Sequence, residues 1–144
     1  MVFHMYHKNI KAYTTQNLQS ELAVADPYRV IQLLMQGCLE RLAQARGAIE
    51  RRDFEQKSQS ISKAMAIING LQDSLDLSYG KVPEDLSALY DYMKARMMDA
   101  SRDMDITAVD EIMNLMLTVK SGWDAIPVEE RDKALAQQKV GGTE

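Results

Sequence analysis

The sequence predicts an all-α protein, an antiparallel up-down four-helix bundle with an N-terminal arm at residues 1–25 and a flexible C-terminal tail at residues 128–144. Four segments between residues 26 and 127 repeat apolar residues at three- and four-residue spacing, which is the period of one helix face. Helix-start signals precede each segment, and almost no stretch alternates in polarity as a strand does. We therefore expect one bundle domain at residues 26–127.

The first two helices have recognisable starts. Asp26-Pro27 is an N-cap followed by proline at the first helical position. Asp53 begins the second helix and, with Gln56 three residues later, resembles a capping box. The first apolar stripe contains Ile31, Leu34, Cys38, Leu42, Ala45 and Ile49, and the second contains Phe54, Ile61, Met65, Ile68 and Leu75.

The last two helices are bounded by proline and aspartate. Gly80 separates the second helix from a third that opens at Pro83-Glu84-Asp85, and Asp105 caps a fourth that Pro127 ends. The third stripe contains Leu86, Leu89, Tyr90, Met93, Met97 and Ala100. The fourth contains Val109, Ile112, Met113, Met116, Trp123 and Ile126.

The two ends of the chain differ from the bundle. Residues 1–25 show weak periodicity and begin with MVFHMYHKNI, which lacks the apolar h-region of a secretory signal. Residues 128–144 are polar and contain Gly141-Gly142, so a disordered tail is expected. No apolar run approaches the roughly 20 residues that span a bilayer, and the expected location is the cytoplasm.

The reactive residues argue against an enzyme. His4 and His7 both lie in the arm, so the helices cannot supply the Glu-x-x-His pairs of a di-iron bundle. Cys38 lies on the core stripe, where we expect a buried thiol rather than a nucleophile. The seven glycines form no phosphate loop. A net charge of −4 with both signs interspersed disfavours duplex nucleic acid as a partner. We expect no cofactor and no metal.

Apolar residues also flank the stripes of three helices. Examples are Val30 and Leu33 in the first, Ile67 and Leu71 in the second, and Leu115 and Val119 in the fourth. Wide faces are ordinary for bundle helices, because each helix touches two neighbours. A soluble protein that leaves part of such a flank exposed often binds a partner there. Helical Gly37, Gly47 and Gly70 fit either close helix packing or a groove that admits a foreign helix.

Two tyrosines in the third helix face different directions. Tyr90 and Tyr92 lie about 200° apart around a helix axis, so they cannot both face one core. Tyr90 falls on the core line. Tyr92 falls on the back, where its ring either lies along Arg96 or contacts a docked peptide.

The chain resembles the flagellar secretion chaperone family, FliS, over roughly residues 8–127. The similar segments, in order, are Ile10-Lys-Ala-Tyr13, Ala25-Asp26-Pro27, Ser62-Lys-Ala, Leu75-Asp-Leu, the block from Asp85 to Met93 with sequence DLSALYDYM, and the segment from Gly122 to Pro127 with sequence GWDAIP. One departure is Leu34-Met35-Gln36-Gly37, where the family usually has Leu-Tyr-Asp-Gly.

The resemblance implies a cytosolic export chaperone that clamps the disordered C-terminal segment of flagellin, blocks premature polymerisation and is recognised by the flagellar export gate. It also implies that Ile10 and Tyr13 form a removable lid. From wheel positions we add six residues to the predicted flagellin-binding surface: Leu33, Ile67, Leu71, Leu89, Tyr92 and Met93. The alternative is a bundle adaptor that uses the same faces to bind another helical partner or to form a homodimer.

Overall fold

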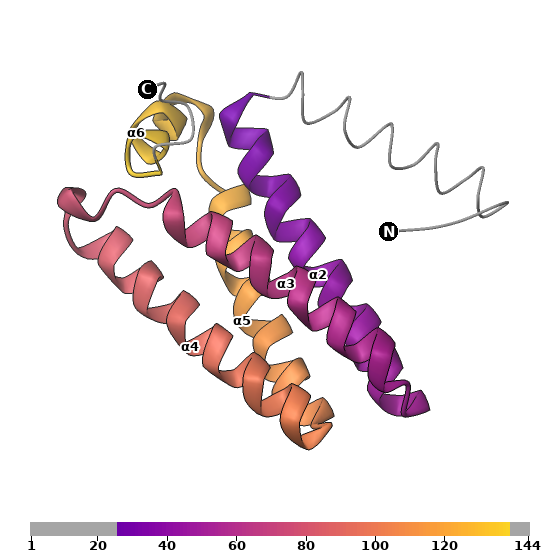
Figure 1. The fold of residues 1–144 in the computed structure, drawn as a ribbon. Coiled ribbons are helices and arrows are strands. Elements are labelled where there is room, and N and C mark those ends of the chain that lie inside the picture. Colours follow the sequence, from indigo (N-terminus) through magenta and orange to yellow (C-terminus); the bar gives the residue numbers. More distant parts are fainter. Residues whose placement is uncertain (1–25, 139–144) are drawn as a thin grey trace, which may run out of the picture.

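A computed structural model describes residues 26–138 of the chain (Figure 1). Four long helices form the bundle: α2 (Pro27–Arg51), α3 (Phe54–Asp73), α4 (Lys81–Asp103) and α5 (Ile106–Asp124). α2 packs against α3 and α5, and α4 packs against the same two helices, so successive helices are neighbours around the bundle. The predicted all-α helical bundle is confirmed.

Aspartate caps start three of the helices, as the sequence predicts. The carboxylates of Asp26, Asp53 and Asp105 accept hydrogen bonds from the backbone N–H groups two or three residues later. Each bond satisfies a donor that the first turn of a helix leaves unpaired. α4 begins differently, at Lys81, two residues before the predicted start. The preceding Gly80 has φ 109°, a conformation that glycine adopts readily, and makes no side-chain cap.

Two short turns of similar design join the helices in pairs. After α2 and after α4 the chain passes through one left-handed residue, Arg52 with φ 57° and Met104 with φ 53°. A capping aspartate follows at once, and its own N–H donates to a carbonyl of the preceding helix, at 2.8 Å for Asp53 and 3.0 Å for Asp105. These turns lie together at one end of the bundle (Figure 1).

The core consists of the predicted stripes with few exceptions. The largest fully buried side chains include Ile31, Leu42, Ile68, Tyr90, Met97, Ile112 and Met116. Tyr90 therefore lies inside, as predicted. Phe54 was assigned to the second stripe, but its side chain is 52% exposed. It is the first residue of α3, and the Arg52 guanidinium lies 5.3 Å from its ring centroid.

The polar tail contains structure that the sequence did not predict. Residues 128–144 were expected to be disordered, but Val128–Glu130 form the 3-10 helix η2 and Arg131–Ala136 form the short helix α6. α6 lies at the end of the bundle opposite the two short turns, beside the start of α2 (Figure 1). Its contacts are with residues distant in sequence, which local composition does not reveal. Residues 139–144 lie outside the described part of the chain.

Within residues 26–138, no helix combines the length and hydropathy that crossing a membrane requires. α5, with Asp110, Glu111, Lys120 and Asp124 along it, is interrupted by charge.

Candidate functional site

The structure places the predicted contact residues at different depths. Four of them remain accessible, three half-buried and one exposed: Leu33, Ile67, Leu89 and Tyr92. Leu71 and Met93 are fully buried in the core, contrary to the expectation that they line a surface. Leu71, on the flank of α3, still reaches the core because two neighbouring helices cover α3, and Met93 lies in the core because it belongs to the core stripe of α4. The predicted lid, Ile10 and Tyr13, lies outside the described residues.

Leu33 and Ile67 are half-buried residues of two neighbouring helices, α2 and α3. A Cβ atom at Gly37 would lie 3.5 Å from Cδ1 of Ile67, which is ordinary contact distance, so Ile67 packs over this glycine. Leu33 lies one helical turn before Gly37 on the same face of α2. The two half-buried side chains therefore form an apolar strip along the seam between these helices.

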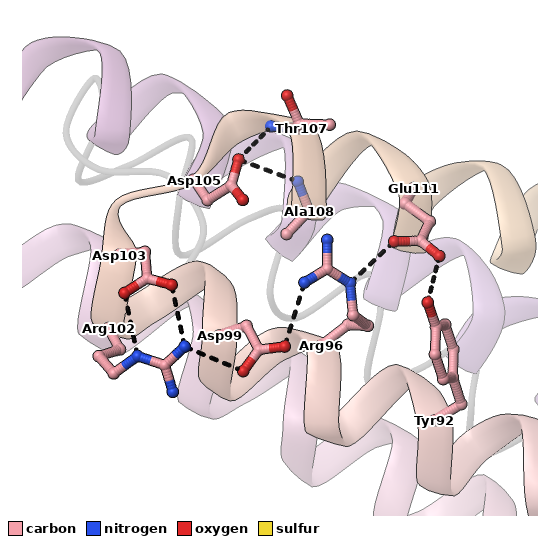
Figure 2. Close-up of polar contacts among 9 residues, drawn as sticks. All are labelled: Tyr92, Arg96, Asp99, Arg102, Asp103, Asp105, Thr107, Ala108 and Glu111. Carbon is pink, nitrogen blue, oxygen red and sulfur yellow. Dashed lines mark hydrogen bonds and ion pairs between the residues drawn. The ribbon is translucent and has the colours of Figure 1, made fainter.

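Tyr92 lies on the flank of α4 that faces α5, rather than on the back of the helix as predicted, and reaches across to α5. Its hydroxyl donates a hydrogen bond to Oε2 of Glu111, while Nε of Arg96 donates to Oε1 of the same carboxylate at 2.8 Å (Figure 2). The ring thus stands beside Arg96 and is joined to it through Glu111. The tyrosine remains 44% exposed, so its ring is accessible to a partner.

Charged residues extend this contact along α4 toward the turn into α5 (Figure 2). Asp99 accepts from Arg96 at 3.1 Å and from Arg102 at 3.3 Å. The Tyr92 hydrogen bond, followed by that of Arg96, holds the pKa of the Glu111 carboxyl below its usual range. Glu111 therefore remains an ionised acceptor at neutral pH and ties α4 to α5.

A pocket of about 260 Å³ lies at the end of the bundle that carries α6. Six side chains from α2, α4 and α5 and from the residues after α5 form most of its apolar wall: Met35, Val82, Leu86, Val119, Trp123 and Ile126. Ala134, Gln137 and Gln138, from α6 and the residues after it, close another side. Sequence reasoning did not find this pocket, although it placed Trp123 and Ile126 on one helix face.

Exposed apolar side chains lie at the start of α4 and in the short helix that contacts it. Leu77 and Tyr79 of the 3-10 helix η1 (Leu77–Tyr79) are 51% and 55% exposed, and Val82 at the start of α4 is 58% exposed. Val82 also lines the pocket. These three large exposed apolar residues lie within six positions of the chain, and we call them the η1 rim.

Comparison with known proteins decides the family. The model of the family "Flagellar protein FliS" matches residues 9–130, most of the chain. The chain belongs to the FliS family. The resemblance inferred from short motifs is thereby confirmed, and with it a role as a flagellar export chaperone.

Three FliS relatives illustrate the similarity. The flagellar secretion chaperone FliSB of Pseudomonas aeruginosa is 47% identical over 120 residues, covering 83% of this chain and 95% of that protein. FliS of Vibrio cholerae is 30% identical over 130 residues, covering 90% and 96%. FliS of Salmonella typhimurium is 35% identical over 119 residues, covering 81% and 88%.

The FliS match ends just before α6. It covers residues 9–130, whereas α6 begins at Arg131. The four bundle helices, the η1 rim and most of the pocket wall therefore belong to the part of the chain shared with the family model. The helix that closes one side of the pocket does not.

The described residues of this FliS protein include no assembled metal site. No group of three or more His, Cys, Asp or Glu side chains within residues 26–138 is placed to hold a metal ion. Burial raises the pKa of the Cys38 thiol to about 12, so it stays protonated. Membership in a chaperone family implies a non-enzymatic role.

Proposed function

We propose that this protein binds the disordered C-terminal segment of flagellin in the cytosol, keeps it from polymerising and delivers it to the flagellar export gate. The observation that carries the proposal is the family match over residues 9–130. Flagellin, the export gate and the cytosol are the specific elements that the proposal adds to the family's role as a secretion chaperone.

The accessible apolar surface supports a client that folds on binding. A disordered segment loses conformational entropy when it becomes ordered, so it needs a large apolar contact to bind firmly. The strip of Leu33 and Ile67, the half-buried Leu89 and the exposed ring of Tyr92 offer such contact on α2, α3 and α4. We assign these four residues to the client-binding surface and propose that Ile10 and Tyr13 of the arm cover part of it.

Titration with a flagellin peptide tests the proposal. A peptide of the last roughly 40 residues of the cognate flagellin should bind with one-to-one stoichiometry in calorimetry and gain helix in circular dichroism, because ordering accompanies burial. A well-folded protein that binds no such peptide would remove flagellin as the client.

Matched variants on α4 locate the contact. Tyr92→Ala should weaken binding by about tenfold if its ring is a central contact. Met98→Ala is the control, since Met98 is on the same helix and is 59% exposed but is not assigned to the surface. Equal weakening by both variants, or by neither, would contradict the assignment of Tyr92.

The η1 rim supports one alternative. Exposed apolar side chains at Leu77, Tyr79 and Val82 suit self-association as well as a client, and a homodimer would cover them. Sedimentation velocity of the protein with and without the flagellin peptide distinguishes the export chaperone from the self-associating adaptor. A dimer that dissociates when the flagellin peptide is added would place both partners on one surface, whereas a stable dimer that ignores the peptide would favour the adaptor role.

A further inference from the structure

α6 covers the bundle end through a small set of long-range contacts. The backbone N–H of Asp76 donates to the carbonyl of Gln137 at 2.7 Å, and the hydroxyl of Ser74 lies 3.2 Å from Oε1 of Gln138. The guanidinium of Arg131 stacks on the ring of Tyr28 at 3.9 Å. These contacts hold the α6 segment, which we define as residues 131–138, against the ends of α2 and α3.

The α6 segment fills the site below it incompletely. Only two of its side chains, Ala134 and Leu135, pack as apolar residues against the core. The pocket of about 260 Å³ remains between the segment and the ends of α4 and α5. An apolar cavity of about 150 Å³ is already large enough to take up benzene. The site therefore has room for large apolar side chains that α6 does not possess.

Two further features make the α6 segment easy to displace. α6 has six residues, and isolated helices shorter than about 12 residues are only marginally stable in water, so its structure depends on the bundle. Nε of Arg131 is buried and has no hydrogen-bond partner among the described residues. Burying an unpaired donor is unfavourable, and release of the segment would return that donor to water.

The η1 rim indicates what replaces α6. Leu77, Tyr79 and Val82 extend the apolar surface beyond the pocket, where α6 leaves them exposed. A longer amphipathic helix with large apolar side chains could fill the pocket and cover this rim together. Helix-in-groove recognition of this kind places apolar residues at three- and four-residue spacing against the partner.

We propose that the pocket and the η1 rim form a docking site for an amphipathic helical stretch of the client, and that the client displaces the α6 segment to occupy it. This inference rests on the proposed function, because the client is the flagellin C-terminal segment. α6 then acts as an internal competitor that protects the apolar site until the client arrives.

A reversible cross-link tests the displacement in the full-length chain. The hydrogen bond between the backbones of Asp76 and Gln137 brings them close enough for a disulfide in the double variant Asp76→Cys/Gln137→Cys. Cys38 is buried and should not take part. The same sample, oxidised and then reduced, compares a locked α6 with a released one, and the two single-cysteine variants serve as further controls.

Binding of the flagellin peptide is then measured by calorimetry. We expect the oxidised form to bind at least about tenfold more weakly than the reduced form, since locking α6 removes the binding-competent state. The reduced form should match the Asp76→Cys single variant, which likewise lacks the hydrogen bond from the Ser78 backbone N–H to the Asp76 carboxylate at the start of η1. Equal affinities of the oxidised and reduced forms would overturn the inference while leaving the proposed function intact. A wild type that binds no peptide would overturn both.

Hydrogen exchange of the wild type gives an independent readout that needs no substitution. The Asp76 amide donates to Gln137, so its exchange should accelerate at least about tenfold when saturating peptide displaces α6. Unchanged or slower exchange with bound peptide would show that α6 stays in place and would overturn the inference.

Discussion

The carboxylate of Glu111 is a shared hydrogen-bond acceptor for Tyr92 and Arg96. Both side chains donate to its carboxylate across the α4–α5 seam (Figure 2). Their hydrogen bonds favour the ionised form and lower its pKa from the usual value of 4.5. As pH falls below that value, Glu111 takes up a proton in the unfolded chain at a higher pH than it does in the folded chain. The contribution of Glu111 to stability is therefore present at neutral pH and is lost in acid.

We predict that Glu111→Gln reduces this acid sensitivity. At pH 7 the variant should unfold at a lower urea concentration than the wild type, because a neutral amide accepts more weakly from Arg96. The difference should narrow as pH falls from about 5 to about 3. Urea melts at several pH values measure it, with Glu84→Gln, an exposed residue near the start of α4, as the control. A difference that is constant over this range would contradict the assigned pKa shift.

Contacts of individual residues divide into those the sequence reveals and those it does not. The caps at Asp26, Asp53 and Asp105 were predictable, because donor and acceptor lie within three residues of each other. The pair of Tyr28 and Trp123 was not, since the two are far apart in sequence. Their rings stack at 5.1 Å, and each side chain donates to the other's backbone carbonyl.

At the scale of the element, the N-cap of α5 tests how much one aspartate cap contributes to the stability of the bundle. The carboxylate of Asp105 accepts from the backbone N–H groups of Thr107 at 2.9 Å and Ala108 at 3.3 Å. We expect Asp105→Ala to lower the free energy of unfolding by about 1 kcal/mol, because both donors lose their partner. Asp105→Asn keeps an acceptor oxygen and should cost less. Chemical denaturation monitored by circular dichroism compares them, and equal losses would indicate that charge rather than capping matters.

Gly70 distinguishes between two explanations for glycine inside a helix. A Cβ atom at Gly70 would meet nothing within 4 Å, whereas one at Gly37 would contact Ile67. The Cβ at Gly37 would make ordinary contact only, so close helix packing within residues 26–138 requires glycine at neither position. A client backbone that approaches α3 would account for Gly70.

We predict opposite effects of Gly70→Ala on folding and on binding. Stability should rise by roughly 0.5–1 kcal/mol, because alanine is the better helix former and has room. Affinity for the flagellin peptide should fall if the client approaches this face. Gln59→Ala is the control, at an exposed position of the same helix. Higher stability with unchanged affinity would remove Gly70 from the client-binding surface.

The helices themselves were largely predictable, and the exceptions have physical causes. Periodicity located four helices because each buries one face over many residues. It misplaced Leu71 because a wheel does not show which flank a neighbour covers, whereas it put Met93 correctly on the core stripe, and choosing Met93 as a surface contact was the error. It missed α6 because six residues carry too little periodicity, and the helix depends on distant partners such as Tyr28 and Asp76.

At the scale of the whole molecule, the two ends of the bundle differ. One end contains the short turns at Arg52 and Met104, each followed directly by a capping aspartate. The other contains α6 (Figure 1) together with the pocket and the η1 rim. At the first end, backbone hydrogen bonds from Asp53 and Asp105 tie each turn to the preceding helix. The second combines a short helix, exposed apolar side chains and unfilled volume, which suits it to rearrangement on binding.

This asymmetry predicts a gradient of local stability along the bundle axis. Amides in the middle of α2 and α3, around Cys38 and Ala64, should exchange hydrogen only on global unfolding, because their side chains are fully buried. The Gln137 and Gln138 amides, which donate within the last turn of the α6 segment, should exchange at least about a hundredfold faster. Exchange measured by NMR on the protein alone, without any client, provides the comparison. If these two amides were as protected as the core, α6 would unfold only with the entire bundle. A client could then not displace it separately, and the docking site at this end would remain closed.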